Sequence, residues 1–254
     1  MPTTHPDMTP ERAWAAVAEV DGWMTRGQSD LLYSAAAGTP DAGQIVEIGS
    51  FQGRSTIVLA LAAPATARIV AIDPHAGNDR GPQELDGYNT EAEHDHRQFL
   101  ANLAAAGVTE RVTHLRAFSD RALGDVAGAI DVLYIDGAHR YAPARADIVA
   151  WGNRVNDHGL MLIHDSFSSV GVTAAIVREL VLGRRFRYVG RSRSLASYVA
   201  VPGGLGGTAR ARNAARQLAQ LTWFARNVAL KVALSAGLGK LLARGGKEPP
   251  EWPY

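Results

Sequence analysis

The sequence predicts an α/β fold, a doubly wound and mostly parallel sheet that ends in an antiparallel edge hairpin. Residues 44–48, 68–73 and 132–135 are short apolar runs, typical of strands buried on both faces. Helix-forming segments separate these runs, and such alternation produces a sheet with helices on both faces. Residues 186–189 and 195–200 follow each other without a helix between them, which predicts the hairpin at one edge.

The elements that precede the first strand are expected to be helical. Thr9 is the expected N-cap of a first helix that begins at Pro10. A second helix is expected over residues 29–37 and ends at Gly38. Residues 1–40 are therefore interpreted as an N-terminal helical cap.

The central region, residues 41–201, continues the alternation of strands and helices and is interpreted as one domain. Thr90 and Glu93 have the spacing of a capping box, which marks the start of a helix. The expected order after the first strand is a helix through Leu61, strand 68–73, helix 90–106, strand 111–115, a short helix near Asp120, strand 132–135, helix 143–151, strand 160–163 and helix 170–182.

The last part of the chain differs in composition. Residues 202–208 are a glycine-rich linker, and residues 209–254 are expected to form a basic amphipathic helix and tail. Eight Lys and Arg and no acidic residue lie between positions 210 and 247. On a helical wheel, one face is apolar and is made of Ala214, Leu218, Leu221, Ala225, Val228 and Val232. This pattern predicts that 209–243 binds an anionic membrane, a second copy of the chain, or its own domain.

Composition excludes several classes of function. The 254 residues contain no Cys, so disulfides, thiolate zinc sites and cysteine nucleophiles are excluded. A formal net charge of +1 gives no overall attraction to nucleic acid, and no nucleic-acid partner is predicted. No secretory signal or run of about eighteen apolar residues is found, so we expect a cytoplasmic protein, peripheral at the inner face of the membrane if the tail binds there.

Acidic and imidazole groups follow two of the predicted strands. Asp136 and His139 come after strand 132–135, and His164 and Asp165 come after strand 160–163. Ligands of open α/β sheets bind outside the carboxyl ends of the strands. We therefore expect these four side chains to surround one point and to form a binding site for a hard metal ion with a base beside it.

The residues that follow the first strand predict a loop that binds a ligand. Gly49 and Gly53 let the chain turn tightly and let a ligand approach the next helix N-terminus. Glu47 stands where the dinucleotide motif has its first glycine, and its carboxylate would repel a pyrophosphate and attract a cationic amino-acid group. A dehydrogenase is therefore the least favoured function.

Two further positions follow the neighbouring strands. Asp73 ends the second strand, where an acid accepts hydrogen bonds from a ribose diol; the alternative is a solvated loop aspartate. Ser119 follows the third strand and either lies near an adenine or caps the next helix. The long loop 74–89 and residues 23–28 are expected to cover the bound substrate that acts as the acceptor of the reaction.

Four segments taken together carry a family resemblance: residues 46–56, 71–74, 134–141 and 163–165. In this order they resemble the class I S-adenosylmethionine-dependent methyltransferases, which have a Rossmann-like fold. The branch they resemble most is that of the metal-dependent O-methyltransferases, including the catechol and macrolide-sugar enzymes, and cephalosporin-hydroxylase-type proteins share the pattern. The resemblance covers roughly residues 20–200 and excludes the C-terminal helix.

The resemblance implies roles for the residues named above. The cofactor, S-adenosylmethionine, would be bound by residues at three strand ends: Glu47, Gly49, Ser50 and Gly53 near its methionine part, Asp73 at its ribose and Ser119 at its adenine. Asp136, Asp165 and His164 would bind a divalent metal. Magnesium is the first expectation, although a histidine ligand suits manganese or iron better.

The function implied is methyl transfer to a hydroxyl of a small-molecule or glycan acceptor, either a sugar or a natural-product or phenolic scaffold. A metal between Asp136 and Asp165 would hold two vicinal oxygens, and His139 would act as the catalytic base. Two alternatives remain open from the sequence. One is a metal-dependent hydroxylase of the cephalosporin-hydroxylase type, and the other is a non-catalytic cofactor-binding module.

Overall fold

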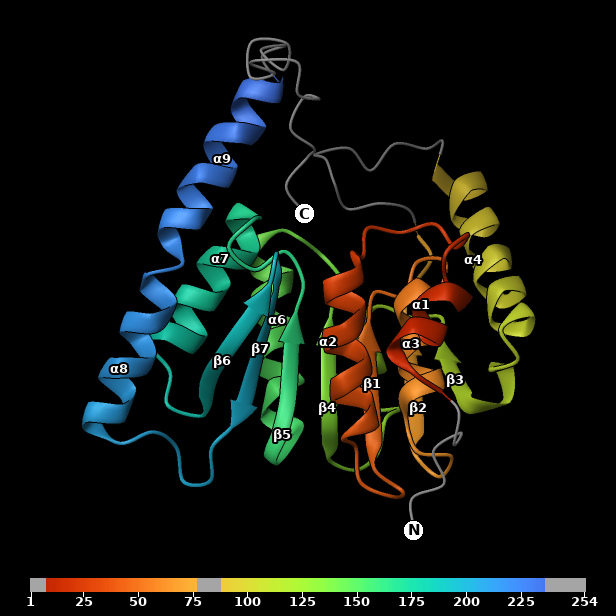
Figure 1. Cartoon of the computed structure of the whole chain (residues 1–254), viewed down its shortest axis with the longest axis horizontal. Helices are drawn as coiled ribbons and strands as arrows, with labels where there is room; N and C mark the ends of the chain where they lie inside the picture. Colours follow the sequence, from red (N-terminus) through yellow and green to blue (C-terminus); the bar gives the residue numbers. More distant parts are fainter. Residues whose placement is uncertain (1–7, 77–87, 236–254) are drawn as a thin grey trace.

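The computed structural model describes residues 8–76 and 88–235 (Figure 1). Its core is a seven-stranded sheet in the order β3-β2-β1-β4-β5-β7-β6. The strands are β1 (Gln44–Ile48), β2 (Arg68–Ile72), β3 (Val112–Leu115), β4 (Ile130–Ile135), β5 (Val155–Ile163), β6 (Phe186–Ser192) and β7 (Leu195–Ala200).

The sheet is parallel from β3 to β5, and β7 runs antiparallel to both of its neighbours. The prediction of a doubly wound sheet with an antiparallel edge hairpin is therefore confirmed. From β1 the chain proceeds outward to β2 and β3, and it then returns to the other side of β1 to add β4 and β5. The crevice that binds ligands in such sheets is consequently expected at the carboxyl ends of β1 and β4.

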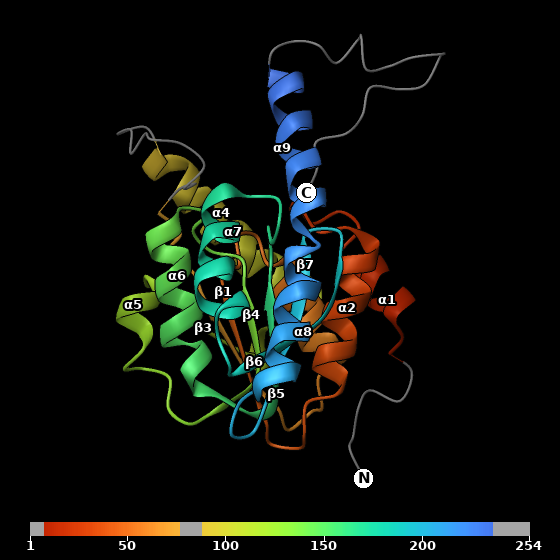
Figure 2. The ribbon, with the colours of Figure 1, turned by 90° about the vertical axis from the view of Figure 1, so that its left-hand side faces the viewer.

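Helices cover both faces of the sheet (Figure 2). One face carries α1 (Pro10–Ala16), α2 (Arg26–Ala37), α3 (Arg54–Ala62) and α4 (Tyr88–Ala105); the other carries α5 (Ser119–Ala122), α6 (Tyr141–Ala150) and α7 (Val170–Ile176) with its π-helical extension Val177–Val181. Leu32, Ile57 and Phe99 are fully buried in the first layer, and Trp151 and Phe167 in the second. Burial of such side chains contributes about 1.5–3 kcal/mol each to folding.

Two elements start at least three residues before their predicted starts. α2 begins at Arg26, three residues before the predicted start, because Thr25 is its N-cap and the Gln28 side chain accepts a hydrogen bond from the Thr25 amide at 2.7 Å. β5 begins at Val155, five residues before the predicted start of the fifth strand. By contrast, Thr9 caps α1 by accepting a hydrogen bond from the Arg12 amide, as predicted.

The tail docks on its own domain as two helices, α8 (Gly207–Leu218) and α9 (Leu221–Ser235), where the sequence predicts one. Asn213 of α8 is buried against the edge strand β6: its side-chain oxygen accepts from the Tyr188 amide at 2.8 Å, and its nitrogen donates to the Phe186 carbonyl at 3.1 Å. The helix thus protects the free edge of the sheet.

Only part of the predicted apolar face of the tail is used for docking. Ala214 and Leu221 pack against the core, whereas 47% of Leu218 and 63% of Val232 are exposed. Among the helices of the described segments, none combines the length and the apolar character needed to cross a membrane.

Candidate active site

The glycine loop after β1 joins three strand ends. Gly49 has φ 85°, its amide donates to the Ile72 carbonyl at 2.8 Å, and a Cβ placed on it would lie 2.2 Å from the carbonyl oxygen of Asp136. Only glycine fits both this backbone conformation and this approach. Gly53 has φ 89° and stands at the N-cap of α3, so the loop points the free amides of that helix toward the crevice.

Glu47 lies fully buried beneath this loop. Its two carboxyl oxygens accept hydrogen bonds from the Ser55 and Thr56 hydroxyls in the first turn of α3. Burial raises its pKa to about 8, so the group is largely uncharged at neutral pH. Glu47 therefore holds the first turn of α3 in place through these two hydrogen bonds. The negative charge on Glu47 that was expected to attract a cationic ligand is weak.

Asp73 holds the same loop from the end of β2. One of its oxygens accepts the amides of Ser50 and Phe51 at 2.9 and 2.8 Å, and the other accepts the His75 amide at 2.7 Å. The ring of Trp23, in the segment 23–28 that is predicted to cover the acceptor, lies 5.3 Å from the ring of Phe51 in this loop. The other predicted cover, 74–89, lies largely outside the described residues.

Ser119 stands at the start of α5, and its hydroxyl donates to Asp147 of α6. Asp147 is 4% exposed, and burial raises its pKa to about 6. The sequence did not single out this aspartate, since an acid inside a helix carries no local signal of burial.

Asp147→Asn is expected to remove a pH-dependent loss of stability. Because the pKa is higher in the folded state, the folded protein binds more protons than the unfolded protein between about pH 4 and pH 6. Wild-type stability should therefore fall as the pH rises through this window. The variant should be roughly 1–3 kcal/mol more stable than wild type at pH 7.5 and no more stable at pH 3.5. Urea unfolding at both values measures this, and an equal difference at both would contradict the assignment.

His139 and Asp165 form the closest acid–imidazole contact of the site. The Nε2 atom of His139 lies 2.7 Å from Oδ2 of Asp165, and Nδ1 of His139 is buried without a hydrogen-bond partner in the described residues. Burial alone would raise the pKa of Asp165, but the hydrogen bond from His139 and the charge of His164 hold it well below its ordinary value. The carboxylate places the ring proton on Nε2 and leaves Nδ1 as a proton acceptor.

The second pair is formed by His164 and Asp136, whose Nδ1 and Oδ1 atoms lie 3.1 Å apart. The hydroxyl of Tyr134 donates to the other oxygen of Asp136 at 2.8 Å. Gln28 of α2 is fully buried, with its amide nitrogen 3.3 Å from Nε2 of His164. The structure thus brings together all four side chains expected at these strand ends. It adds Tyr134 and Gln28, to which the sequence assigned no individual role.

This arrangement does not fit the predicted metal centre of Asp136, Asp165 and His164. One oxygen of Asp136 and one of Asp165 lie 3.1 and 3.9 Å from Nδ1 of His164, while their other oxygens face the Tyr134 hydroxyl and Nε2 of His139. Within residues 8–76 and 88–235, no group of three or more His, Cys, Asp or Glu is arranged to hold a metal. Magnesium needs several oxygen ligands in an octahedron, so no catalytic step is assigned to it here.

The turn that carries Asp165 is strained and is supported by the tail. Asp165 and Phe167 have φ of 54° and 56°, which is unfavourable for residues with a side chain. Asn227 donates to the Phe167 carbonyl at 3.3 Å, and Lys231 donates to the Ser168 carbonyl at 3.2 Å. α9 is therefore part of the structure that positions the His139–Asp165 pair.

Comparison with known proteins identifies a related domain and similar folds. A family model described as a methyltransferase domain matches residues 46–166, from β1 to the end of β5. A solved protein from Corynebacterium glutamicum is similar with a TM-score of 0.55 at 17% identity, covering 78% of this chain and 92% of that chain. The O-methyltransferase TomG from Streptomyces achromogenes, solved with SAM, has a TM-score of 0.51 at 16% identity, covering 80% and 92%.

The structural similarity extends to a protein whose description names a different substrate. A putative rRNA-methylase from Clostridium thermocellum has a TM-score of 0.52 at 10% identity, covering 72% of this chain and 100% of that chain. At such identities the structures establish the fold and leave the acceptor undecided.

Proposed function

We propose that this chain is a class I S-adenosylmethionine-dependent methyltransferase that transfers the methyl group to a hydroxyl oxygen of a small-molecule or glycan acceptor. The observation that carries the proposal is the His139–Asp165 pair, whose nitrogen and oxygen lie 2.7 Å apart in the segments that follow β4 and β5. A hydroxyl needs a base to accept its proton as it is methylated, and an imidazole oriented by a carboxylate is such a base.

The bound cofactor supplies an electrophilic methyl group on a sulfonium. Held by the residues of the glycine loop, it would give this methyl group to the acceptor oxygen and would leave as S-adenosylhomocysteine. The imidazole of His139 would take the hydroxyl proton, and Asp165 would stabilise the imidazolium that results. Positioning of the oxygen in line with the methyl group supplies much of the rate.

The residues of the glycine loop are proposed to bind the cofactor. Asp73 already holds the amides of Ser50 and Phe51 in place, and its carboxylate is the acceptor we assign to the ribose diol. Ser119 is proposed to lie beside the adenine, with its hydroxyl held by Asp147. Gly49 and Gly53 would allow the methionine part to approach the N-terminus of α3.

The predicted role of a divalent metal is the least supported part of the sequence-based function, because Asp136 and Asp165 are paired with imidazoles. The hydroxylase alternative depends on a metal and is disfavoured for the same reason. Sugars, natural products and phenols all present the hydroxyl that the pair would deprotonate, so all three remain candidate acceptors.

Calorimetric titration with S-adenosylhomocysteine tests the proposal. We expect binding of equal affinity in the presence of magnesium and in the presence of EDTA, because the loop residues contact the cofactor without a metal. Absence of binding in both conditions would contradict the proposed function. Binding that requires magnesium would instead restore the predicted metal centre of Asp136, Asp165 and His164.

A further inference from the structure

Charge is distributed very unevenly along this chain. Residues 180–247 contain 13 of the 26 Lys and Arg and no Asp or Glu. The other residues contain 13 Lys and Arg against all 25 Asp and Glu, so they are strongly acidic. A nearly neutral protein therefore has one strongly cationic segment, which attracts anions to a single side of the molecule.

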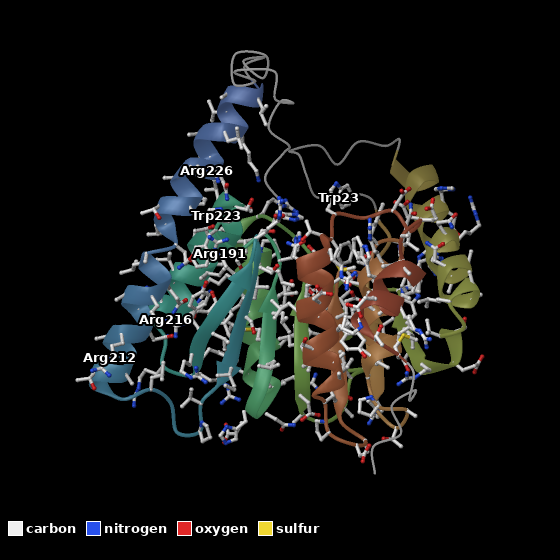
Figure 3. The ribbon with its side chains drawn as sticks, in the orientation of Figure 1. Trp23, Arg191, Arg212, Arg216, Trp223 and Arg226 are labelled. Atoms are coloured by element: carbon white, nitrogen blue, oxygen red, sulfur yellow. The ribbon has the colours of Figure 1, made fainter. Side chains whose placement is uncertain are left out.

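The described part of this segment forms one flank, made of β6, α8 and α9, at the outer edge of the sheet (Figure 3). We call it the basic flank. Arg212, Arg216 and Arg226 are exposed on its helices, and Arg187 and Arg193 are exposed on and beside β6. In the described segments, no ion pair with a carboxylate is formed by any of these five arginines.

A shallow depression lies on the basic flank between β6 and α8, lined by Arg191, Arg216, Gln220 and Tyr188. The guanidinium of Arg191 is stacked over the ring of Trp223 at 3.9 Å, and its Nε donates to Gln220 at 2.9 Å. Arg216 donates to the Val189 carbonyl at 2.9 Å. Each guanidinium has five N–H donors, so both arginines are held in place with donors to spare.

Neither of these two guanidinium groups has a carboxylate partner in the described structure. Arg191 is half-buried, and this burial lowers its pKa because a partly buried charge is less well solvated than an exposed one. An anion bound in the depression would relieve this cost. Phosphate suits two planar guanidinium groups, because it accepts paired hydrogen bonds from each.

Exposed aliphatic side chains are interspersed with these cations. Leu182 and Val189 are 53% and 45% exposed, and their carbonyls accept hydrogen bonds from Arg210 and Arg216. Leu218 and Val232 are exposed along the helices. Aliphatic groups among cations favour the headgroup region of a lipid bilayer. Nucleic acid is less favoured because the rings of Trp223 and Tyr188 at this depression are covered by the guanidinium groups of Arg191 and Arg216, at 3.9 and 5.7 Å, and do not offer a free stacking surface.

We propose that the basic flank binds the surface of an anionic phospholipid membrane, with a lipid phosphate held between Arg191 and Arg216. The inference does not depend on the acceptor or on the methyl transfer proposed above. Membrane binding would nevertheless affect the acceptor and the methyl transfer, because helix α9 of the basic flank also supports the turn that carries Asp165. A flank on the membrane would place the carboxyl edge of the sheet close to amphiphilic acceptors.

Co-sedimentation with vesicles tests this proposal with the full chain. We expect binding to vesicles of phosphatidylcholine with phosphatidylglycerol, weak binding to phosphatidylcholine alone, and loss of binding in high salt. Arg212→Gln/Arg226→Gln removes two exposed charges whose side chains make no hydrogen bond or ion pair within the described structure. Arg191→Gln/Arg216→Gln removes the two guanidinium groups that line the depression. Each pair should weaken binding about 30-fold, from roughly fivefold for each arginine.

The matched control is Arg68→Gln/Arg97→Gln, which removes the same charge from exposed positions outside the basic flank. This variant should bind the anionic vesicles like wild type. Equal weakening in all three variants would overturn the proposal, because it would show that only net charge matters. Competition by inorganic phosphate at millimolar concentration would overturn the assignment of a lipid headgroup. Tighter binding to a single-stranded oligonucleotide than to vesicles would identify nucleic acid as the partner instead.

Discussion

His139→Ala is expected to lower kcat for methyl transfer by about 10²–10⁴-fold, the range usually contributed by a general base. Binding of S-adenosylhomocysteine should remain within about threefold of wild type, because His139 lies after β4 and the cofactor loop after β1 is held by other contacts. Single-turnover kinetics with labelled cofactor measures the first effect, and calorimetry measures the second.

His94→Ala is the matched control, since His94 is exposed on α4 away from the His139–Asp165 pair. It should leave both quantities unchanged. A His139→Ala enzyme that keeps wild-type turnover would remove the base from the mechanism and favour a purely positional role. Asp165→Asn gives a second check. It keeps the shape of the turn but loses the charge that orients the imidazole, so kcat should fall while KM changes little.

Gly49→Ala is expected to destabilise the fold by more than about 4 kcal/mol, which is exceptional for one methyl group. Its Cβ would lie 2.2 Å from the Asp136 carbonyl oxygen and 2.8 Å from the Gly137 amide nitrogen, both of which are backbone atoms. The ends of β1 and β4 would have to separate. The glycine loop follows β1, and Asp136 and His139 follow β4, so both parts of the site would be displaced. Urea unfolding monitored by tryptophan fluorescence measures the loss.

The matched control for this substitution is Gly107→Ala. Gly107 also has a positive φ, 68°, but an added Cβ meets nothing within 4 Å. It should therefore cost only the conformational strain, about 1–2 kcal/mol. Similar losses in the two variants would mean that strain, and not contact between the strand ends, requires glycine at position 49.

Much of the fold follows from local patterns in the sequence. Buried parallel strands are short and apolar on both faces, so 44–48 and 68–73 can be recognised without tertiary information. Because parallel strands end at the same edge, the positions of Asp136, His139, His164 and Asp165 near one another also follow from their order. Boundaries were less predictable where a side-chain contact decides them, as at Thr25 and Gln28.

The sequence by itself determined which groups meet at the carboxyl edge, and only the tertiary structure decided how they pair. Asp165 approaches His139 to 2.7 Å in a turn with φ of 54°, and that turn is held by Asn227 and Lys231 from the distant tail. The packing of α8 is likewise decided by tertiary contacts: its buried Asn213 bonds to the edge strand β6, and its buried Gln217 donates to the Leu180 carbonyl. Residue type limits the bonds that a side chain can form, but partner, distance and burial depend on how the elements pack. Those three decide whether two carboxylates bind a metal or orient a base.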